Sequence, residues 1–397
     1  MFINKKEDFN KLLLAKDRIS TLLKHEDRIF SLKKIATEIK KLSLENKNNE
    51  LLAFFYFLEE SINLINTNSE KYFSQTLPRG IVLNIPSSNI PMMPFYTWVP
   101  SFLSGNTNFV RLSRKSDIKL ISNIISLIDK VLGKEESKKQ IFYRGDIDYD
   151  ITAEISLNCD VRMIWGNDPT IKEIKRDFPT SACIELNYKN RNSASLIDSN
   201  EYLRMSTPQK RIFLKKYLND SLSFSFAACS SPQYTFWIGS KKTNIDAQTT
   251  FIKDLKTHFN QTDIDKGIIA TNNLESFQSF FIDSNHKTFD QLFLLCGRGV
   301  ALVDIRELIN VTDSFLNANS LFVSVETFEE FINSFPKNIQ TLTYSSELDI
   351  AFLKDLPRLL NYKCPDRIIP FGDALKFSMT WDGTNFFNIL RKKVVIK

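Results

Sequence analysis

The segment that decides the fold begins Gly80-Ile-Val-Leu-Asn-Ile85, continues Pro86-Ser-Ser-Asn-Ile-Pro91, and closes with Asn108-Phe-Val-Arg-Leu112. The two apolar runs have the length of buried strands, and the loop between them is followed by an apolar helical stretch. Gly105-Asn106 is a stop signal for that helix. A strand, a helix and a second strand in this order predict a crossover unit on a parallel sheet.

The same alternation continues toward residue 170 and predicts an α/β fold with a parallel sheet covered by helices on both faces. The predicted elements are the helices 92–103, 118–132 and 147–157, the strands 140–144 and 160–165, and a turn, Gly166-Asn-Asp-Pro-Thr170, that opens another helix.

The regions on either side of this segment have apolar residues at helical or strand spacing. Residues 4–66 predict two or three amphipathic helices that serve as packing. The second half repeats the mixture of helices and strands less cleanly, and it contains neither an internal repeat nor a low-complexity linker. Its predicted elements are the helices 208–222, 245–259, 274–281, 326–335 and 348–360 and the strands 233–238, 291–296, 300–303, 321–325 and 341–344.

Length and composition indicate an ordinary globular protein of about two domains. The chain has 397 residues, of which 43% are hydrophobic and 25% charged. Its first residues do not resemble a signal peptide, and its most apolar windows are too short or too rich in proline to span a bilayer. A cytoplasmic protein without a membrane span is therefore expected.

Charge, cysteine and histidine content narrow the function classes. The net charge of +6 is spread along the chain, and no basic-aromatic patch of the nucleic-acid-binding kind occurs. The mild excess of positive charge fits either a solvated surface or affinity for a polyanionic ligand such as coenzyme A or NADP. The five scattered cysteines predict reduced thiols rather than a disulfide framework or a zinc site. The three isolated histidines argue against a His-based metal site and give only thin support to a Ser-His-Asp or Cys-His site. No Gly-x-Gly-x-x-Gly occurs, which argues against the usual dinucleotide phosphate loop.

One cysteine lies in a distinctive environment. The stretch Ser223-Phe-Ser-Phe-Ala-Ala-Cys-Ser-Ser-Pro-Gln-Tyr-Thr-Phe-Trp237 places Cys229 among small residues, which allow a carbonyl to approach the sulfur closely. Ser-Ser-Pro then breaks regular structure where a nucleophile would face a cleft. The alternative is a cysteine that acts as a small buried hydrophobic residue.

Four segments, in the correct order, resemble the aldehyde dehydrogenase superfamily and its acyl-CoA reductase (LuxC-type) branch. Ile85-Pro-Ser-Ser-Asn-Ile-Pro91 with Pro100-Ser-Phe-Leu-Ser-Gly-Asn-Thr-Asn-Phe-Val-Arg111 is similar to the first superfamily signature. Ala228-Cys-Ser-Ser-Pro-Gln233 is similar to the nucleophile segment of that branch. Arg367-Ile-Ile-Pro-Phe-Gly372 and Trp381-Asp-Gly383 resemble its C-terminal signature, although Trp381 and its neighbours would also serve as a simple helix cap.

The resemblance implies a catalytic set of Cys229, Asn89 and Glu185. Cys229 would accept the acyl group, and the Asn89 amide with the Cys229 backbone N–H would bind the oxyanion. Glu185 would be the family's general base, although it lies farther before Cys229 than is usual. The alternatives are an Asx turn for Asn89 and a strand-edge carboxylate for Glu185.

The resemblance also implies a nicotinamide cofactor, with NADPH favoured over NADH. Arg111, Ser113 and Arg114 would hold its 2′-phosphate, and Gly166 and Thr170 would lie under the pyrophosphate. A charged strand end and an ordinary turn are the respective alternatives.

The expected architecture is aldehyde-dehydrogenase-like, with a parallel-sheet nucleotide-binding domain and a smaller α/β catalytic domain. The expected parts are residues 1–207 for the N-terminal helices and cofactor domain, 208–365 for the catalytic domain, and 366–397 for a segment that closes the cleft.

The expected activity is NADPH-dependent reduction of a fatty acyl thioester, as acyl-CoA or on an acyl carrier, to an aldehyde. The two alternatives are oxidation of free aldehydes and an acyl-carrying subunit that transfers no hydride. The family further implies an acyl-protein synthetase as partner, and a homo-oligomer is expected.

Overall fold

The chain divides into two compact units. Unit 1 comprises Met1–Asn190 and Lys376–Lys397, and unit 2 comprises Arg191–Leu375. The sequence places the boundary later, after residue 207, and starts its C-terminal segment at residue 366. The computed structural model describes residues 2–3, 24–88, 90–113, 118–144, 149–176, 182–189, 191–222, 228–259, 289–295, 298–303, 320–345, 348 and 350–396.

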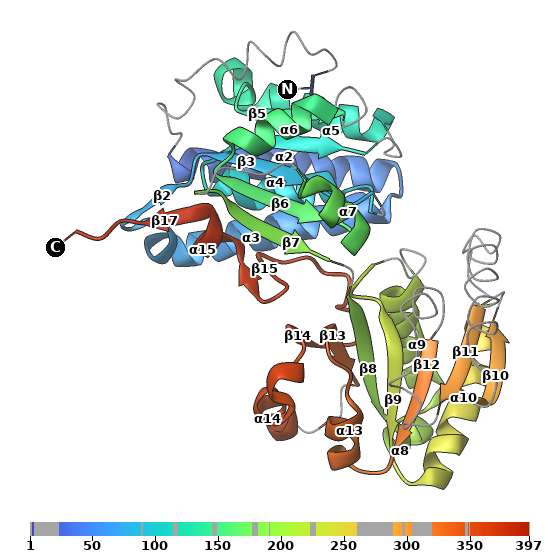
Figure 1. Ribbon diagram of the computed structural model, residues 1–397. Helices are drawn as coiled ribbons and strands as arrows, with labels where there is room; N and C mark the ends of the chain where they lie inside the picture. Colours follow the sequence, from blue (N-terminus) through green and yellow to red (C-terminus); the bar gives the residue numbers. More distant parts are fainter. Residues whose placement is uncertain are drawn as a thin grey trace. The chain divides into compact units, whose positions relative to one another are not determined.

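Unit 1 is built on a six-stranded sheet in which every neighbouring pair is parallel. Its strand order is β1-β5-β4-β3-β6-β7, so the chain moves outward from the central β3 in one direction and then returns to continue in the other (Figure 1). The strands are β1 (Phe2–Ile3), β3 (Ile81–Ile85), β4 (Thr107–Leu112), β5 (Gln140–Arg144), β6 (Val161–Trp165) and β7 (Ile184–Tyr188).

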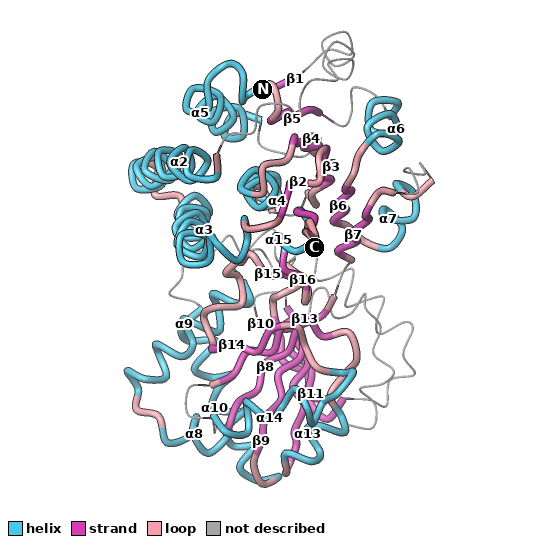
Figure 2. The backbone as a smooth tube through the Cα atoms, turned by 90° about the vertical axis from the view of Figure 1, so that its left-hand side faces the viewer, coloured by secondary structure: helices cyan, strands magenta, loops and turns pink. Residues whose placement is uncertain are grey.

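Helices cover both faces of this sheet. Successive side chains of a strand point to opposite faces, and both sets are apolar in the central strands, so each face is buried under helices. Figure 2 shows one group of helices on one face and a second group on the other. The first group is α2 (His25–Glu45), α3 (Asn49–Phe73), α4 (Met93–Leu103) and α5 (Ile118–Ser137), and the second is α6 (Tyr149–Asn158) and α7 (Asp168–Ile174).

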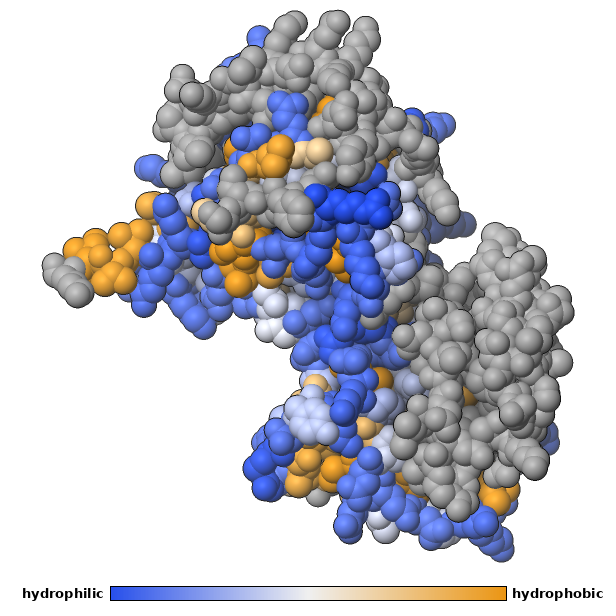
Figure 3. Space-filling view, viewed as in Figure 1, coloured by the Kyte–Doolittle hydropathy of each residue, from blue (hydrophilic) through white to orange (hydrophobic). Residues whose placement is uncertain are grey.

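The end of the chain belongs to unit 1. Its elements are β15 (Thr380–Trp381), β16 (Thr384–Asn385), α15 (Phe386–Leu390) and β17 (Arg391–Lys393), of which β17 pairs with β2 (Thr76–Pro78). Asn106 holds this return in place, because its side chain accepts from the Gly80 N–H and donates to the Leu390 carbonyl, both at 3.0 Å. Beyond β17, Val395 and Ile396 are exposed and form the apolar end visible in Figure 3.

Unit 2 has a seven-stranded sheet of order β10-β11-β12-β9-β8-β13-β14, parallel except for the β10–β11 pair. Helices again cover both faces, with α8, α9 and α10 on one and α13 and α14 on the other. The strands are β8 (Asn192–Asp198), β9 (Pro232–Ile238), β10 (Phe289–Leu295), β11 (Arg298–Val303), β12 (Ser320–Val325), β13 (Ile339–Tyr344) and β14 (Arg367–Pro370). The helices are α8 (Ser199–Arg204), α9 (Thr207–Leu222), α10 (Lys241–Phe259), α13 (Phe328–Ser334), α14 (Ile350–Leu360) and the 3-10 turn η3 (Asn361–Lys363).

The α/β prediction is confirmed, and most predicted elements lie within a few residues of their observed positions. The sequence analysis did not predict the edge strands β7 and β14, nor β8, which is a central strand of unit 2. The helix predicted for 274–281 lies outside the described residues. Within the part of the chain that the structure describes, no helix combines the length and apolar character needed to cross a bilayer.

Candidate active site

Cys229 lies in a tight turn directly before the buried strand β9. The turn is closed by a hydrogen bond of 2.9 Å from the Ser231 N–H to the Ala228 carbonyl. Ala228, Ser230 and Ser231 are buried, whereas Cys229 itself is only half-buried. Pro232 ends the turn and opens β9, a position at which proline loses no ladder hydrogen bond. The small residues therefore bury the turn while the cysteine keeps partial access to solvent.

The backbone of this turn is fixed by Ser193 on the neighbouring strand β8. The Ser193 hydroxyl donates to the Cys229 carbonyl at 2.7 Å and accepts from the Thr341 N–H on β13 at 3.2 Å. Ser193 is fully buried. Its hydroxyl thus links the candidate nucleophile to a strand on the far side of β8.

Ser193 occupies this role because both strands beside β8 are irregular at its position. On β9 the pairing passes from Pro232 to Tyr234, so Gln233 is an extra residue, and its side chain accepts from the Ser193 N–H at 2.7 Å. On β13 the pairing also shifts opposite Ser193, between Ile339 and Leu342. Bulges of this kind redirect backbone groups and are common beside active sites.

The C-terminal signature, Arg367–Gly372, is also anchored within unit 2. The buried Asp220 carboxylate at the end of α9 accepts from the Gly372 N–H at 2.7 Å and the Ala374 N–H at 3.1 Å. Arg367 donates to the carbonyls of Ala374 and Asp373. Burial raises the pKa of Asp220 to about 7, although the two backbone donors oppose this shift. Sequence reasoning missed Asp220, whose only signal is an acidic residue near the end of an amphipathic helix.

Most of the other predicted site residues lie in unit 1. Arg111 is half-buried near the carboxyl end of β4, and Ser113 follows that strand. Gly166 comes directly after β6, and Thr170 is in the first turn of α7, where its N–H donates to the Asn167 side chain at 3.0 Å. Two further predicted residues, Asn89 and Arg114, lie outside the described residues.

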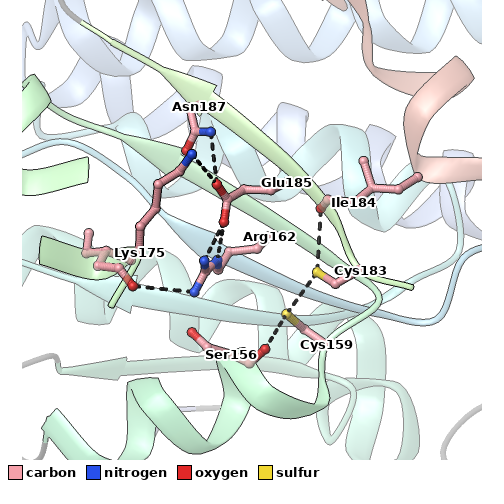
Figure 4. A network of polar contacts seen from close by, with 9 residues as sticks. Ser156, Cys159, Arg162, Lys175, Cys183, Ile184, Glu185 and Asn187 are labelled. Carbon is pink, nitrogen blue, oxygen red and sulfur yellow. Dashed lines mark hydrogen bonds and ion pairs between the residues drawn. The ribbon is translucent and has the colours of Figure 1, made fainter. Parts of the chain in front are cut away.

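Glu185 is held on β7 by three side chains, as Figure 4 shows. One carboxylate oxygen accepts from Arg162 on β6, at 3.0 Å from Nε, while the other lies 2.8 Å from Lys175 Nζ and 3.0 Å from Asn187 Nδ2. Burial opposes ionisation, but the hydrogen bonds from Lys175, Arg162 and Asn187 outweigh it and lower the pKa of Glu185 to about 2. A carboxylate so strongly stabilised as an anion is a weak proton acceptor, which favours the structural interpretation of Glu185.

Comparison with known structures gives the fold. A glyceraldehyde-3-phosphate dehydrogenase, GapN, from Methanocaldococcus jannaschii in complex with NADP matches with a TM-score of 0.70 at 14% identity, over 98% of this chain and 93% of that one. A mutant of Thermus thermophilus 1-pyrroline-5-carboxylate dehydrogenase matches with a TM-score of 0.71 at 12% identity, over 98% and 85%. Aldehyde dehydrogenase 21 from Physcomitrella patens matches with a TM-score of 0.69 at 10% identity, over 98% and 89%.

The predicted aldehyde-dehydrogenase-like fold is therefore confirmed. No curated protein sequence matches the chain. The family model for acyl-CoA reductase (LuxC), in contrast, matches residues 4–259, which include Cys229 and its turn. This match covers more than half of the chain and agrees with the motifs read from the sequence. The chain belongs to the LuxC family of acyl-CoA reductases.

Proposed function

We propose that this protein reduces an acyl thioester, with acyl-CoA as the donor, to an aldehyde by way of an acyl-cysteine on Cys229. The observation that carries the proposal is the half-buried Cys229 in a turn whose carbonyl is fixed by Ser193. Membership of the LuxC family supports an oxidoreductase that acts on acyl groups.

In this mechanism the Cys229 thiolate attacks the thioester carbonyl carbon, and the coenzyme A thiolate leaves. The oxyanion formed in that step needs two donors, and we assign them to the Asn89 side chain and the Cys229 backbone N–H. The hydrogen bond from Ser193 to the Cys229 carbonyl limits movement of the turn during the attack. A bound reduced nicotinamide supplies the hydride for the second half of the reaction. The Cys229 sulfur then leaves as thiolate, and the aldehyde is released.

The sheet of unit 1 fits a dinucleotide. In a parallel sheet whose strand order reverses, ligands bind at the carboxyl ends of the strands beside the reversal, here β3 and β6. Gly166 lies at this edge, and a Cβ there would come within 3.2 Å of Thr170 Cγ2, so the turn has room only for glycine unless Thr170 moves. Because glycine has no side chain, a phosphate can approach the backbone closely at such a position.

We propose NADPH rather than NADH on the basis of Arg111, with Ser113 and Arg114 beside it. Arg111 is half-buried near the carboxyl end of β4, and a guanidinium at this place could bind a 2′-phosphate through two parallel hydrogen bonds. One similar fold, GapN, is described in complex with NADP. Another, betaine aldehyde dehydrogenase from Staphylococcus aureus, is described in complex with NAD⁺.

The reduction consumes no water, so the reaction does not require a general base that activates water. The ion-paired Glu185 is consistent with this direction. An aldehyde-oxidising enzyme would require such a base, and for it the Glu185→Gln variant would be inactive while acyl-CoA would be inert.

The test is to mix the protein with an acyl-CoA and NADPH and to follow the loss of absorbance of the reduced nicotinamide. Turnover is expected in the wild type and in Cys364→Ala, which changes another half-buried cysteine of unit 2, and not in Cys229→Ala. Undiminished turnover in Cys229→Ala would refute the mechanism. A labelled acyl group that forms a hydroxylamine-sensitive adduct but is unaffected by NADPH would instead identify an acyl carrier.

A further inference from the structure

Two cysteines of unit 1, neither of which is the candidate nucleophile Cys229, lie in contact with each other. Cys159 comes directly after α6 and Cys183 directly before β7, and the parallel pairing of β6 with β7 brings them together. Their Sγ atoms are 3.7 Å apart and point toward one another in Figure 4. A disulfide requires about 2.05 Å, so the two sulfurs need to approach by about 1.7 Å.

The two thiols differ in access and in acidity. Cys159 is 2% exposed, and its Sγ lies 3.5 Å from the Ser156 carbonyl, whereas Cys183 is only half-buried. The hydrogen bond between the two thiols lowers the pKa of Cys183, assisted by the Arg162 guanidinium and opposed by burial. The same hydrogen bond and burial raise the pKa of Cys159. A half-buried thiol with a lowered pKa beside a buried thiol with a raised pKa is the arrangement of an attacking and a resolving cysteine.

We propose that Cys159 and Cys183 form a reversible intramolecular disulfide when the protein meets a low-molecular-weight disulfide. The Cys183 thiolate attacks one sulfur of the reagent and releases the first reagent thiol, which leaves a mixed disulfide on Cys183. Cys159 then loses its proton and attacks Cys183 Sγ, and the second reagent thiol is released. Two protein thiols are oxidised by two electrons, and the reagent disulfide is reduced to two thiols.

The proposed bond would close the β6–α7–β7 crossover at its amino end. In the reduced protein that end is held by the hydrogen bond from the Ile184 N–H to the Asp160 carbonyl, at 3.0 Å, and by the Arg162–Glu185 pair. Cross-linking residues 159 and 183 restricts the unfolded chain, so oxidation should raise the unfolding temperature of unit 1 by about 5–10 °C. The site does not involve Cys229, so it is independent of the proposed reaction.

The experiment uses the full chain, fully reduced, and oxidised glutathione as the probe. After incubation and removal of the reagent, thiols are counted in denaturant, and peptides are mapped by mass spectrometry before and after treatment with dithiothreitol. The expected result is a cross-linked peptide pair containing Cys159 and Cys183, in which both thiols of the pair are lost without bound glutathione, and full reversal by dithiothreitol. The matched variants are Cys183→Ser, which should lose the cross-link and the rise in unfolding temperature, and Cys364→Ser, which should keep both.

Two results would overturn the proposal. One is a stable glutathione adduct on Cys183 with Cys159 still reduced, since the resolving step would then not occur. The other is a pair of thiols that remain reduced while glutathione modifies other cysteines. Because the wild type alone decides between these outcomes, poor folding of a variant would not affect the conclusion.

Discussion

Replacing Ser193 by alanine tests whether the serine between the two bulges positions the nucleophile. The substitution removes the donor to the Cys229 carbonyl and the acceptor for the Thr341 N–H. A buried polar group left without its partner costs about 1–3 kcal/mol, and the Thr341 amide is fully buried whereas the Cys229 turn can gain water. We therefore expect a loss of about 2–4 kcal/mol, or about 5–15 °C in unfolding temperature for a unit of this size.

The substitution is also expected to lower the reactivity of Cys229. A shift of about 1 Å in a reacting group can lower the rate by about 10²-fold. The matched control is Ser195→Ala on the same strand, since the Ser195 hydroxyl is also buried and lies 2.8 Å from the Thr343 hydroxyl, but it does not contact the Cys229 turn. Ser193→Ala should slow acylation of Cys229 by about 10- to 10²-fold, while Ser195→Ala should react at the wild-type rate.

Two quantities are measured. One is the rate at which iodoacetamide alkylates Cys229, followed on its peptide by mass spectrometry, and the other is kcat/KM for acyl-CoA. Both are measured well below the unfolding temperature of each variant. If Ser193→Ala alkylates and turns over like the wild type, the hydrogen bond to the Cys229 carbonyl does not position the sulfur. Equal slowing in Ser195→Ala would attribute the effect to general loosening of β8 instead.

Three further predictions concern stability. Burial raises the pKa of Asp220 from 3.8 to about 7, so the folded state binds the proton more tightly than the unfolded state. Stability should therefore fall by up to about 4 kcal/mol as pH rises from about 4 to 7. Urea unfolding across this range should show that fall in the wild type and not in Asp220→Asn. Glu185 should have the opposite effect because its pKa is lowered: it stabilises the protein above its ordinary pKa, and this contribution is lost as pH falls toward 2. The Glu185→Gln variant should also lose about 3 kcal/mol of stability at pH 7, because the buried Arg162 is left without its carboxylate. An acid titration, followed by circular dichroism, that is unchanged in the variant would contradict both expectations. Gly105 has a φ of 88°, and a Cβ there would lie 3.0 Å from Arg28 Nη1. The Gly105→Ala variant should therefore lose about 1–3 kcal/mol of stability, measured by thermal unfolding. An unchanged melting temperature would mean that the turn readjusts.

The sequence predicted the β3–α4–β4 unit because its signals are local: two apolar runs, a prolyl loop, and a Gly-Asn turn. It did not predict β8, whose first residues read Asn-Ser-Ala-Ser. Small polar residues are poor strand signals on their own. The buried hydroxyls of Ser193 and Ser195 have hydrogen-bond partners on β13, and Ser193 also donates to the Cys229 carbonyl. Those partners depend on sheet register, which local patterns do not contain.

The candidate site was predictable to a similar degree. Cys229 could be found from its small neighbours and from the order of the motifs. Its turn depends on Ser193, which lies 36 residues earlier in the sequence, and this contact could not be predicted without the strand order. Likewise, Glu185 was a candidate only through the family resemblance and at an unusual distance before Cys229, and nothing in the local sequence indicated that Arg162 would lie opposite it on β6.

The return of the chain end to unit 1 has a consequence for biosynthesis. Unit 1 lacks Leu390 and Arg391 until the ribosome has made all of residues 191–375, a delay of about 10–40 s at ordinary translation rates. During that interval the Asn106 side chain lacks its acceptor, the Leu390 carbonyl, and the apolar surface that Phe386 and Phe387 later cover is exposed to water. The nascent N-terminal half should therefore be a chaperone client, and a fragment of residues 1–190 should aggregate unless a peptide of residues 376–397 is supplied.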